Sequence, residues 1–260
     1  MNISLENKTA VICGSTQGIG LAIAQELAAL NCRCMLIARD ENRLQQALDL
    51  LKGGREGHGY AVADFTSNAE VEQAITRIVQ QQTVHILINN TGGPAPGAIT
   101  EAGTSQFSGA FSQHLLNYQL LAQAVFPGMK QAGYGRIINI VSTSVKIPIA
   151  NLGVSNTIRA ATAAWAKTWS LEAGPFGITV NNILPGYTST QRLDSLIATN
   201  AARQQITAAE LAQRMQQQIP ARRFGKPAEI AALAAFLASP AAAYINGASI
   251  PVDGGSTGAF

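Results

Sequence analysis

The 260-residue sequence contains few charged residues, three cysteines and no long hydrophobic run. Charged residues make up 13% of the chain, against roughly 25% in typical soluble proteins, so we expect part of its surface to be buried between subunits. The net charge of +3 is small and the basic residues are scattered, which argues against nucleic acid or an anionic membrane as a partner. No apolar run approaches the ~18 residues that a membrane-spanning helix needs.

The beginning of the sequence and the cysteines bear on the compartment. MNISLENKTAVICG lacks the charged and apolar segments of a signal peptide, so we expect a cytoplasmic protein. Cys13, Cys32 and Cys34 lie in apolar surroundings. Their odd number and spacing predict reduced core thiols rather than disulfides or a metal site.

Short apolar runs alternate regularly with longer amphipathic segments along the whole chain. The runs are apolar on both faces, as in strands of a parallel sheet that helices cover on both sides. This pattern predicts one α/β domain over residues 1–260, a doubly wound Rossmann-like fold with a seven-stranded parallel sheet and helices on both faces. The predicted strands are KTAVICG, CRCMLIA, GYAVAD, HILINN, RIINIVS, ITVNNILPG and ASIPVDGG.

One segment interrupts this alternation. Residues 187–219 are polar, rich in Gln and Ala, and follow the sixth predicted strand. They leave the sheet at the carboxyl end of a strand, where open α/β sheets bind ligands. We therefore predict a substrate lid made of two helical pieces, with a solvated surface excursion as the alternative.

The loop CGSTQGIG joins the first predicted strand to the first predicted helix. Gly14, Gly18 and Gly20 allow a tight turn and a close approach of the backbone to a pyrophosphate, which then faces the helix N-terminus. Such a turn can also serve only to pack a helix on a strand. Its place between the first strand and a helix favours nucleotide binding.

The GxxxGxG spacing of this loop resembles that of the short-chain dehydrogenase/reductase superfamily. NNTGG at 89–93 is similar to the NNAG element of that family, and PGYTST at 185–190 is similar to its PGxxxT turn. The segment RFGKPAEIAALAAFLAS with INGASIPVDGG resembles the C-terminal third of the 3-oxoacyl-carrier-protein reductase branch. The resemblance covers essentially the whole chain and implies a homotetrameric oxidoreductase with a nicotinamide cofactor and a small-molecule substrate. The cofactor-binding residues that it implies are Gly14, Ser15, Thr16, Gln17, Gly18, Ile19, Gly20, Arg39, Asp64, Asn90, Gly92, Arg159, Pro185, Gly186, Thr188 and Thr190.

The residues after the second predicted strand, in LIARDENRL, bear on the choice of cofactor. Arg39 follows the small Ala38, and an arginine grips a phosphate through paired N–H donors. This favours NADP(H), and Gln17 occupies a position where NADP-preferring relatives often carry a second base. The alternative gives Asp40 the ribose hydroxyls, leaves Arg39 in solvent and favours NAD(H).

The proton-transfer residues depart from the family pattern. The family uses a serine, a tyrosine, a lysine and a helix-borne asparagine, and Ser142 fits the serine. Ser155 stands where the tyrosine belongs and Arg159 where the lysine belongs, while His114 occupies the asparagine position with Asn117 one turn later. A serine hydroxyl is too short and too weak an acid to replace a phenol, and an arginine holds its proton at all working pH values. Losing general acid catalysis costs about 10²–10⁴ in rate.

Three groups are candidates to replace the missing phenol. Tyr187 lies beside the nicotinamide pocket if the resemblance holds, and His114 titrates near neutrality if it faces the cleft. A water held by Ser142, Ser155 and Arg159 is the third. A pocket-wall role for Tyr187 and a packing role for His114 are the alternatives.

Three functions remain compatible with these residues. The first is an NADP(H)-dependent oxidoreductase that acts on a small carbonyl or alcohol with a substitute proton route. The second is a dinucleotide-binding protein with little or no turnover, such as a sensor or an assembly partner. The third is the non-redox chemistry of halohydrin dehalogenases, which resemble the family; they keep the tyrosine and lose the glycine loop, the reverse of this sequence, which argues against it.

Overall fold

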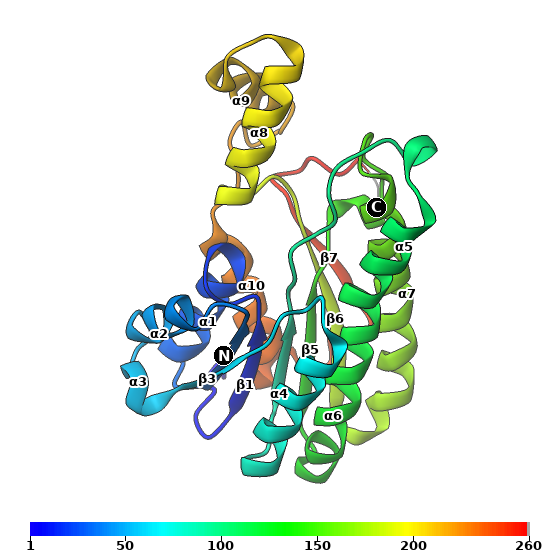
Figure 1. Ribbon diagram of the computed structural model, residues 1–260. Helices are drawn as coiled ribbons and strands as arrows, with labels where there is room; N and C mark the ends of the chain where they lie inside the picture. Colours follow the sequence, from blue (N-terminus) through cyan, green and yellow to red (C-terminus); the bar gives the residue numbers. More distant parts are fainter. Residues whose placement is uncertain (259–260) are drawn as a thin grey trace.

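The computed structural model describes residues 1–258, which form one sheet of seven parallel strands with helices on both faces (Figure 1). The strand order is β3-β2-β1-β4-β5-β6-β7. The strands are β1 (Thr9–Cys13), β2 (Arg33–Ala38), β3 (Gly59–Val62), β4 (Ile86–Asn89), β5 (Gly135–Ile140), β6 (Ile178–Pro185) and β7 (Ser249–Val252). The predicted fold class is confirmed.

Helices connect successive strands. The α-helices are α1 (Gly18–Ala29), α2 (Glu41–Asp49), α3 (Gly54–Gly57), α4 (Asn68–Gln81), α5 (Thr104–Phe111), α6 (Asn117–Ala132), α7 (Gly153–Ala173), α8 (Gln191–Gln204), α9 (Ala208–Gln217) and α10 (Pro227–Ala238). Five short turns are of the 3₁₀ or π type: η1 (Ile99–Glu101), η2 (Ser112–Leu116), η3 (Thr143–Val145), η4 (Gly174–Phe176) and η5 (Pro240–Ala242). Only η2, which leads directly into α6, is a π-helical turn among these described elements.

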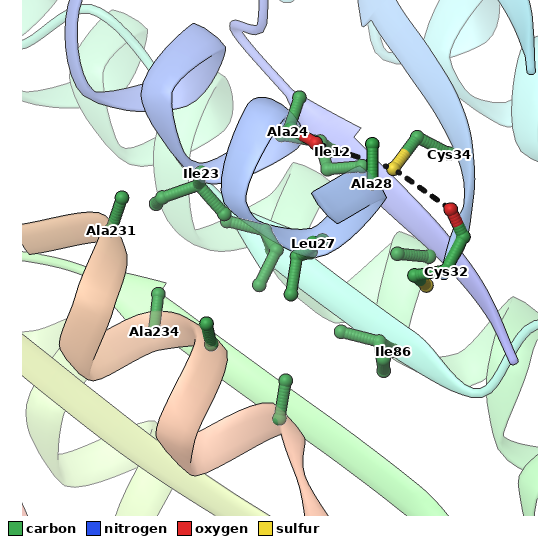
Figure 2. Close-up of a cluster of buried hydrophobic side chains, with 14 of the residues drawn as sticks. Ile12, Ile23, Ala24, Leu27, Ala28, Cys32, Cys34, Ile86, Ala231 and Ala234 are labelled. Atoms are coloured by element: carbon green, nitrogen blue, oxygen red, sulfur yellow. Dashed lines mark hydrogen bonds between the residues drawn. The ribbon is translucent and has the colours of Figure 1, made fainter. Parts of the chain in front are cut away.

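The two faces of the sheet bury separate apolar clusters. Successive strand residues alternate between them, so that Ile12 faces α1 and α10 while Val11 faces α4, α6 and α7. Figure 2 shows the first cluster, where Ile23 and Leu27 of α1 lie on the side toward Ala231 and Ala234 of α10, while Ala24 lies beside Cys34 of β2. All three cysteines are buried free thiols, as predicted.

The strand order reverses at β1, which lies between β2 and β4. The carboxyl ends of β1 and β4 therefore flank a crevice where doubly wound sheets bind their ligands. The glycine loop follows β1 and NNTGG begins in β4, so the fold brings the two motifs together at this point.

Helices α8 and α9 stand together at one end of the molecule, beyond the main body (Figure 1). They share a small apolar core made of Leu193, Ile197, Ala201 and Leu211. The segment 187–219 is thus helical in two pieces, as its sequence predicts. Across residues 1–258, no helix combines the length and hydropathy needed to cross a membrane.

Candidate active site

The glycine loop is held against β4 by an asparagine. Gly14 and Gly18 have φ values of +58° and +56°, which side chains with a Cβ adopt at a cost. The Asn90 amide donates hydrogen bonds to the carbonyl oxygens of Gly14, at 3.1 Å, and Cys13, at 3.3 Å. A Cβ on Gly20 would lie 2.7 Å from the Asn90 amide nitrogen. Gly20 therefore lets helix α1 begin directly behind this loop.

The same loop leaves polar groups without protein partners. Gln17 is the N-cap of α1, and its side chain makes no capping hydrogen bond to the first turn. The Ser15 hydroxyl is fully buried and has no hydrogen-bond partner among the described residues. A buried unpaired hydroxyl beside uncapped helix N–H groups is the environment that a bound phosphate would satisfy. These residues fit a dinucleotide pyrophosphate.

The end of β2 provides basic groups for the adenosine half. Asp40 is the N-cap of α2 and accepts a 3.0 Å hydrogen bond from the Arg43 backbone N–H. Arg39 is exposed, and the Arg43 guanidinium donates to Gln17 Oε1 at 3.4 Å. Asp64 lies nearby and accepts two 2.9 Å hydrogen bonds from Thr66 on one carboxylate oxygen. Asp40, the residue that would favour NAD(H), thus uses its carboxylate to cap helix α2.

A cavity of about 630 Å³ opens between the carboxyl ends of the strands and helix α8. Of the predicted residues, Ile19, Asn90, Ser142, Ser155, Arg159, Pro185, Gly186, Tyr187, Thr188 and Thr190 line it. Its size is typical of small-molecule sites. The remaining predicted residues lie outside its lining; they are Gly14, Ser15, Thr16, Gln17, Gly18, Gly20, Arg39, Asp64, Gly92 and His114.

The substituted pair projects into this cavity from α7. Ser155 is buried, and Arg159, one turn later, donates a 2.8 Å hydrogen bond to the Ile140 carbonyl oxygen. Burial lowers the pKa of the Arg159 guanidinium, while nearby Tyr118 opposes this shift. Ser142 caps η3 by accepting from the Ser144 N–H at 3.1 Å. Ser142, Ser155 and Arg159 thus bring two hydroxyls and one cation to the cavity.

His114 does not face the cavity, which corrects the expectation that it acts there directly. It lies in the π-helical turn η2, is 2% exposed, and hydrogen-bonds through Nδ1 to the Thr91 hydroxyl at 2.7 Å. Its Nε2 is buried without a partner among the described residues. Burial, assisted by Arg159 and Arg192, lowers its pKa to about 3. The imidazole is therefore neutral at physiological pH and is not a general acid there.

Asn117, one turn after His114, also lies outside the cavity lining. The Asn117 amide donates to the Phe65 carbonyl oxygen at 2.8 Å, and its oxygen accepts from the Asn68 amide. Asn117 is fully buried and outside the cavity lining. It ties α6 to the loop after β3, so we assign it no part in the site.

A second residue, Tyr118, also hydrogen-bonds to the Thr91 hydroxyl, and it is not among the site residues predicted from the sequence. The phenol of Tyr118, which is 1% exposed, hydrogen-bonds to Thr91 Oγ1 at 2.9 Å. Burial raises the pKa of this phenol, and the charge of Arg159 opposes the rise. Thr91 itself lines the cavity. A phenol and a cation thus remain near the site, but the phenol comes from α6 and reaches the cavity through a threonine.

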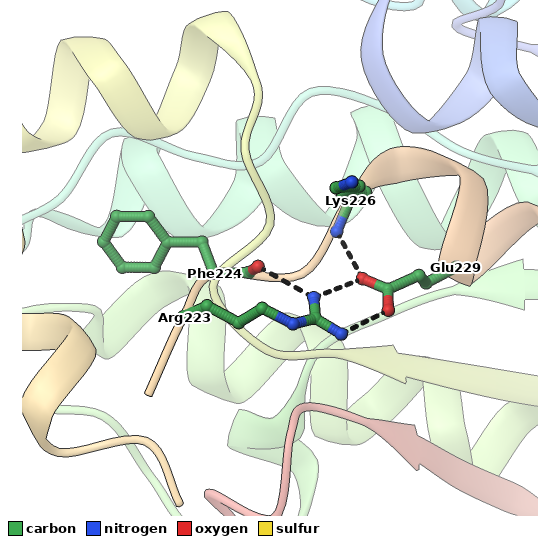
Figure 3. A network of polar contacts seen from close by, with 4 residues as sticks. All are labelled: Arg223, Phe224, Lys226 and Glu229. Carbon is green, nitrogen blue, oxygen red and sulfur yellow. Dashed lines mark hydrogen bonds and ion pairs between the residues drawn. The ribbon is translucent and has the colours of Figure 1, made fainter. Parts of the chain in front are cut away.

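Tyr187 stands at the base of the predicted lid. Its ring lies edge-on to Phe224, and its carbonyl oxygen accepts a 2.9 Å hydrogen bond from the Gly225 N–H. Arg223 and Glu229 form a two-point ion pair that fixes the returning chain to the start of α10 (Figure 3). The two ends of the α8–α9 segment are thus fastened together beside the cavity.

Burial of neutral His114 makes the folding stability depend on pH. The unfolded chain takes up a proton near pH 6.5, but the folded protein does so only near pH 3. We therefore expect the free energy of unfolding to fall as the pH drops below about 6.5 and to keep falling until about pH 3. Urea unfolding of wild type and His114→Asn between pH 4 and 8 checks this, because the variant should lose part of that slope; equal slopes would contradict it.

Comparison with known proteins identifies the class. The sequence model of a family described as "Enoyl-(Acyl carrier protein) reductase" matches residues 14–257. The chain is 32% identical over 255 residues to the NADPH-dependent reductase BacG of Bacillus subtilis, with 97% of this chain and 98% of BacG covered. It is 34% identical over 257 residues to the 3-oxoacyl-[acyl-carrier-protein] reductase FabG of Vibrio cholerae, with 97% and 98% covered.

Solved structures agree with this assignment. The crystal structure of YwfH, described as an NADPH-dependent reductase involved in bacilysin biosynthesis, superposes with a TM-score of 0.92 at 31% identity, covering 97% of this chain and 99% of YwfH. That of L-sorbose reductase from Gluconobacter frateurii, complexed with NADPH and L-sorbose, gives 0.93 at 29% identity, with both chains fully covered. The chain belongs to the short-chain dehydrogenase/reductase family. The predicted class, an oxidoreductase of this type, is confirmed.

Proposed function

We propose that the protein is an NADP(H)-dependent oxidoreductase that interconverts a small carbonyl compound and its alcohol. One observation carries this proposal: a single cavity joins Ile19 of the glycine loop, and Asn90, which is hydrogen-bonded to this loop, to Ser142 and Arg159. A nucleotide seated on the loop would have its reactive end beside these two side chains. The uncapped start of α1 and the unpaired Ser15 hydroxyl support the nucleotide half of the proposal.

NADP(H) is the cofactor that the structure and the relatives favour. Arg39 and Arg43 supply positive charge at the end of β2, while Asp40 is occupied as a helix cap. BacG is named an NADPH-dependent reductase, and the L-sorbose reductase structure contains NADPH. An arginine pair at this point suits the 2′-phosphate that distinguishes NADPH from NADH.

Neutralising this pair should weaken NADPH binding selectively. We expect Arg39→Gln with Arg43→Gln to raise the Kd for NADPH about 10-fold or more, with the Kd for NADH nearly unchanged, because only NADPH loses charge-assisted hydrogen bonds. Calorimetry, or quenching of tryptophan fluorescence, measures both constants. Arg33→Gln, at the opposite end of β2, is the matched control. Equal Kd values for the two nucleotides in wild type would contradict the NADP(H) assignment.

The bound nicotinamide supplies or accepts the hydride, and the protein groups act on the substrate oxygen. Ser142, at the start of η3 after β5, and Arg159 of α7 both line the cavity. The Ser142 hydroxyl can donate a hydrogen bond to a carbonyl oxygen, and the Arg159 charge stabilises an oxygen that becomes negative. Arg159 also retains donors for ribose hydroxyls after its bond to Ile140.

Thr91 is the group that delivers the proton in this proposal. If His114 carries its hydrogen on Nδ1, both His114 and Tyr118 donate to Thr91 Oγ1 and leave the threonine hydrogen for the cavity. Thr91 passes this hydrogen to the substrate oxygen and takes one from the Tyr118 phenol, and Arg159 stabilises the resulting phenolate. Tyr187 and a water held by Ser142, Ser155 and Arg159 are the competing donors.

The segment 187–219 closes the cavity in this proposal. Leu193, Leu196 and Arg192 of α8 line the cavity, so movement of α8 would open or cover it. Helices α5 and α7 and the turn η2 expose large apolar side chains at Phe111, Leu171 and Leu116, respectively. Such exposed groups support the homotetramer that we expect from the family resemblance.

Nucleotide binding without turnover is the second candidate function. The absence of the tyrosine and lysine of the family pattern at Ser155 and Arg159 favours it. A panel of ketones, aldehydes and oxo acids, followed by loss of NADPH absorbance, separates the two candidates. Tight NADPH binding with no turnover across the panel would favour the second.

A further inference from the structure

The cavity carries two cations and no anion. Arg159 enters it from α7 and Arg192 from α8, while none of its described lining residues is Asp or Glu. The four ion pairs among the described residues lie on the surface, and neither arginine takes part in them. Among the described residues, the two guanidinium groups donate to three carbonyl oxygens, which satisfy only a few of their ten N–H donors.

The position of Arg192 is unfavourable for a cation. It is the second residue of α8, where the partial positive charge of the helix N-terminus repels it. Its guanidinium lies 3.3 Å from the Gly93 carbonyl oxygen and 3.4 Å from that of Pro94, at the long end of hydrogen-bond distances. Burial lowers the pKa of Arg192, and the charge of Arg192 contributes to lowering that of Arg159. A negative group between the two would relieve each of these costs.

Part of the cavity wall is apolar. Pro94, Ile147, Pro148, Leu152 and Leu196 contribute to it. Such a wall suits a hydrocarbon body, and it offers no negatively charged group to a basic substrate.

We propose that this pocket takes an oxo acid or hydroxy acid, with the carbonyl or alcohol at Ser142 and the carboxylate on Arg192. The planar fork of Arg192 can donate two parallel hydrogen bonds to the carboxylate, and Arg159 faces the same anion from across the cavity. This inference rests on the proposed oxidoreductase function. The cofactor phosphates are the other source of oxyanions near the site, and the experiment separates the two.

The experiment compares acids with their neutral esters. Benzoylformate and 3-oxohexanoate are each paired with the methyl ester, so the reacting carbonyl stays and only the charge is lost. Binding is measured by calorimetry in the presence of NADP⁺, and KM and kcat are measured with NADPH, for wild type, Arg192→Gln and Arg192→Lys. Arg203→Gln, in the last turn of the same helix and outside the cavity, is the matched control.

We expect wild type to bind at least one acid about 10- to 100-fold more tightly than its ester, the effect of charged hydrogen bonds. Arg192→Gln should remove this preference through KM with little change in kcat, Arg192→Lys should keep part of it, and Arg203→Gln should leave it intact. Equal affinities for acid and ester in wild type would overturn the inference. So would an Arg192→Gln variant that loses NADPH affinity but keeps the preference for the acid, because Arg192 would then hold a cofactor phosphate. Failure of wild type to bind NADPH at all would contradict the proposed function itself.

Discussion

Replacing Tyr118 with phenylalanine is expected to lower kcat by about 10²–10⁴-fold, the usual contribution of general acid catalysis. The variant keeps the ring, which packs edge-on against His114 and lies beside Trp165, so the loss should not come from a cavity in the core. Only the hydroxyl that hydrogen-bonds to Thr91 disappears. The Kd for NADPH and the KM for the substrate should stay close to the wild-type values, because Tyr118 does not line the cavity.

The threonine provides the decisive comparison. Thr91→Val keeps the shape and removes the hydroxyl, so it should reproduce the loss in kcat, whereas Thr91→Ser should restore most of the activity. Tyr134→Phe is the matched control, since this partly buried phenol donates to the Ala238 carbonyl oxygen and lies outside the cavity. Single-turnover oxidation of NADPH as a function of pH measures the proton step. Wild-type rates in Tyr118→Phe, together with a large loss in Tyr187→Phe, would assign the donor to Tyr187.

The fold was predictable because its signals are local and repeated. The strand runs are largely apolar, and inner strands such as β1 and β4 are buried along their whole length between the two helical layers, which requires that pattern. The glycine loop was predictable because its signal is also local: Gly14 and Gly18 stand at the positions where the loop adopts positive φ. The sequence alone allows two roles for Asp40, and in the structure its side chain caps α2.

The orientation of His114 could not be obtained by counting residues along a helix. The turn η2 is a π-helix, which contains more residues per turn than an α-helix and so rotates the side chains within it relative to α-helical spacing. The rotation is a property of the folded backbone, so counting residues in the sequence does not reveal it. It explains why a residue at the family's asparagine position is buried behind Thr91.

The contact of Thr91 with Tyr118 joins residues 27 positions apart, and no local pattern encodes it. One signal was nevertheless present in the sequence: NNTGG differs from the NNAG pattern of the family at Thr91. A hydroxyl placed where an alanine is usual, in a chain that lacks the usual phenol, is the change that the proposed proton route through Thr91 requires. Arg192 carried a weaker signal, as a basic residue at the start of a helix.

A methyl group on Gly20 should selectively disable the nucleotide site. Its Cβ would lie 2.7 Å from the Asn90 amide nitrogen and would also meet the Gly14 carbonyl oxygen. Those atoms are joined by the hydrogen bond that holds the loop at the crevice, so the loop must move. Strain from overpacking amounts to about 1–3 kcal/mol. If the free protein relaxes by moving the loop, binding must restore it, and the Kd for NADPH should rise about 5- to 150-fold.

A matched glycine in another helix separates this effect from helix propensity. Gly109 lies in α5, and a Cβ there would meet no atom within 4 Å. Alanine is the better helix former by about 1 kcal/mol, so Gly109→Ala should leave NADPH binding unchanged and should not lower the unfolding temperature. Gly20→Ala should instead lose affinity for NADPH and NADH alike, because the pyrophosphate is common to both. Titration of both variants with both nucleotides measures this; a Gly20→Ala protein that binds NADPH as wild type does would show that the loop between β1 and α1 is not where the nucleotide sits.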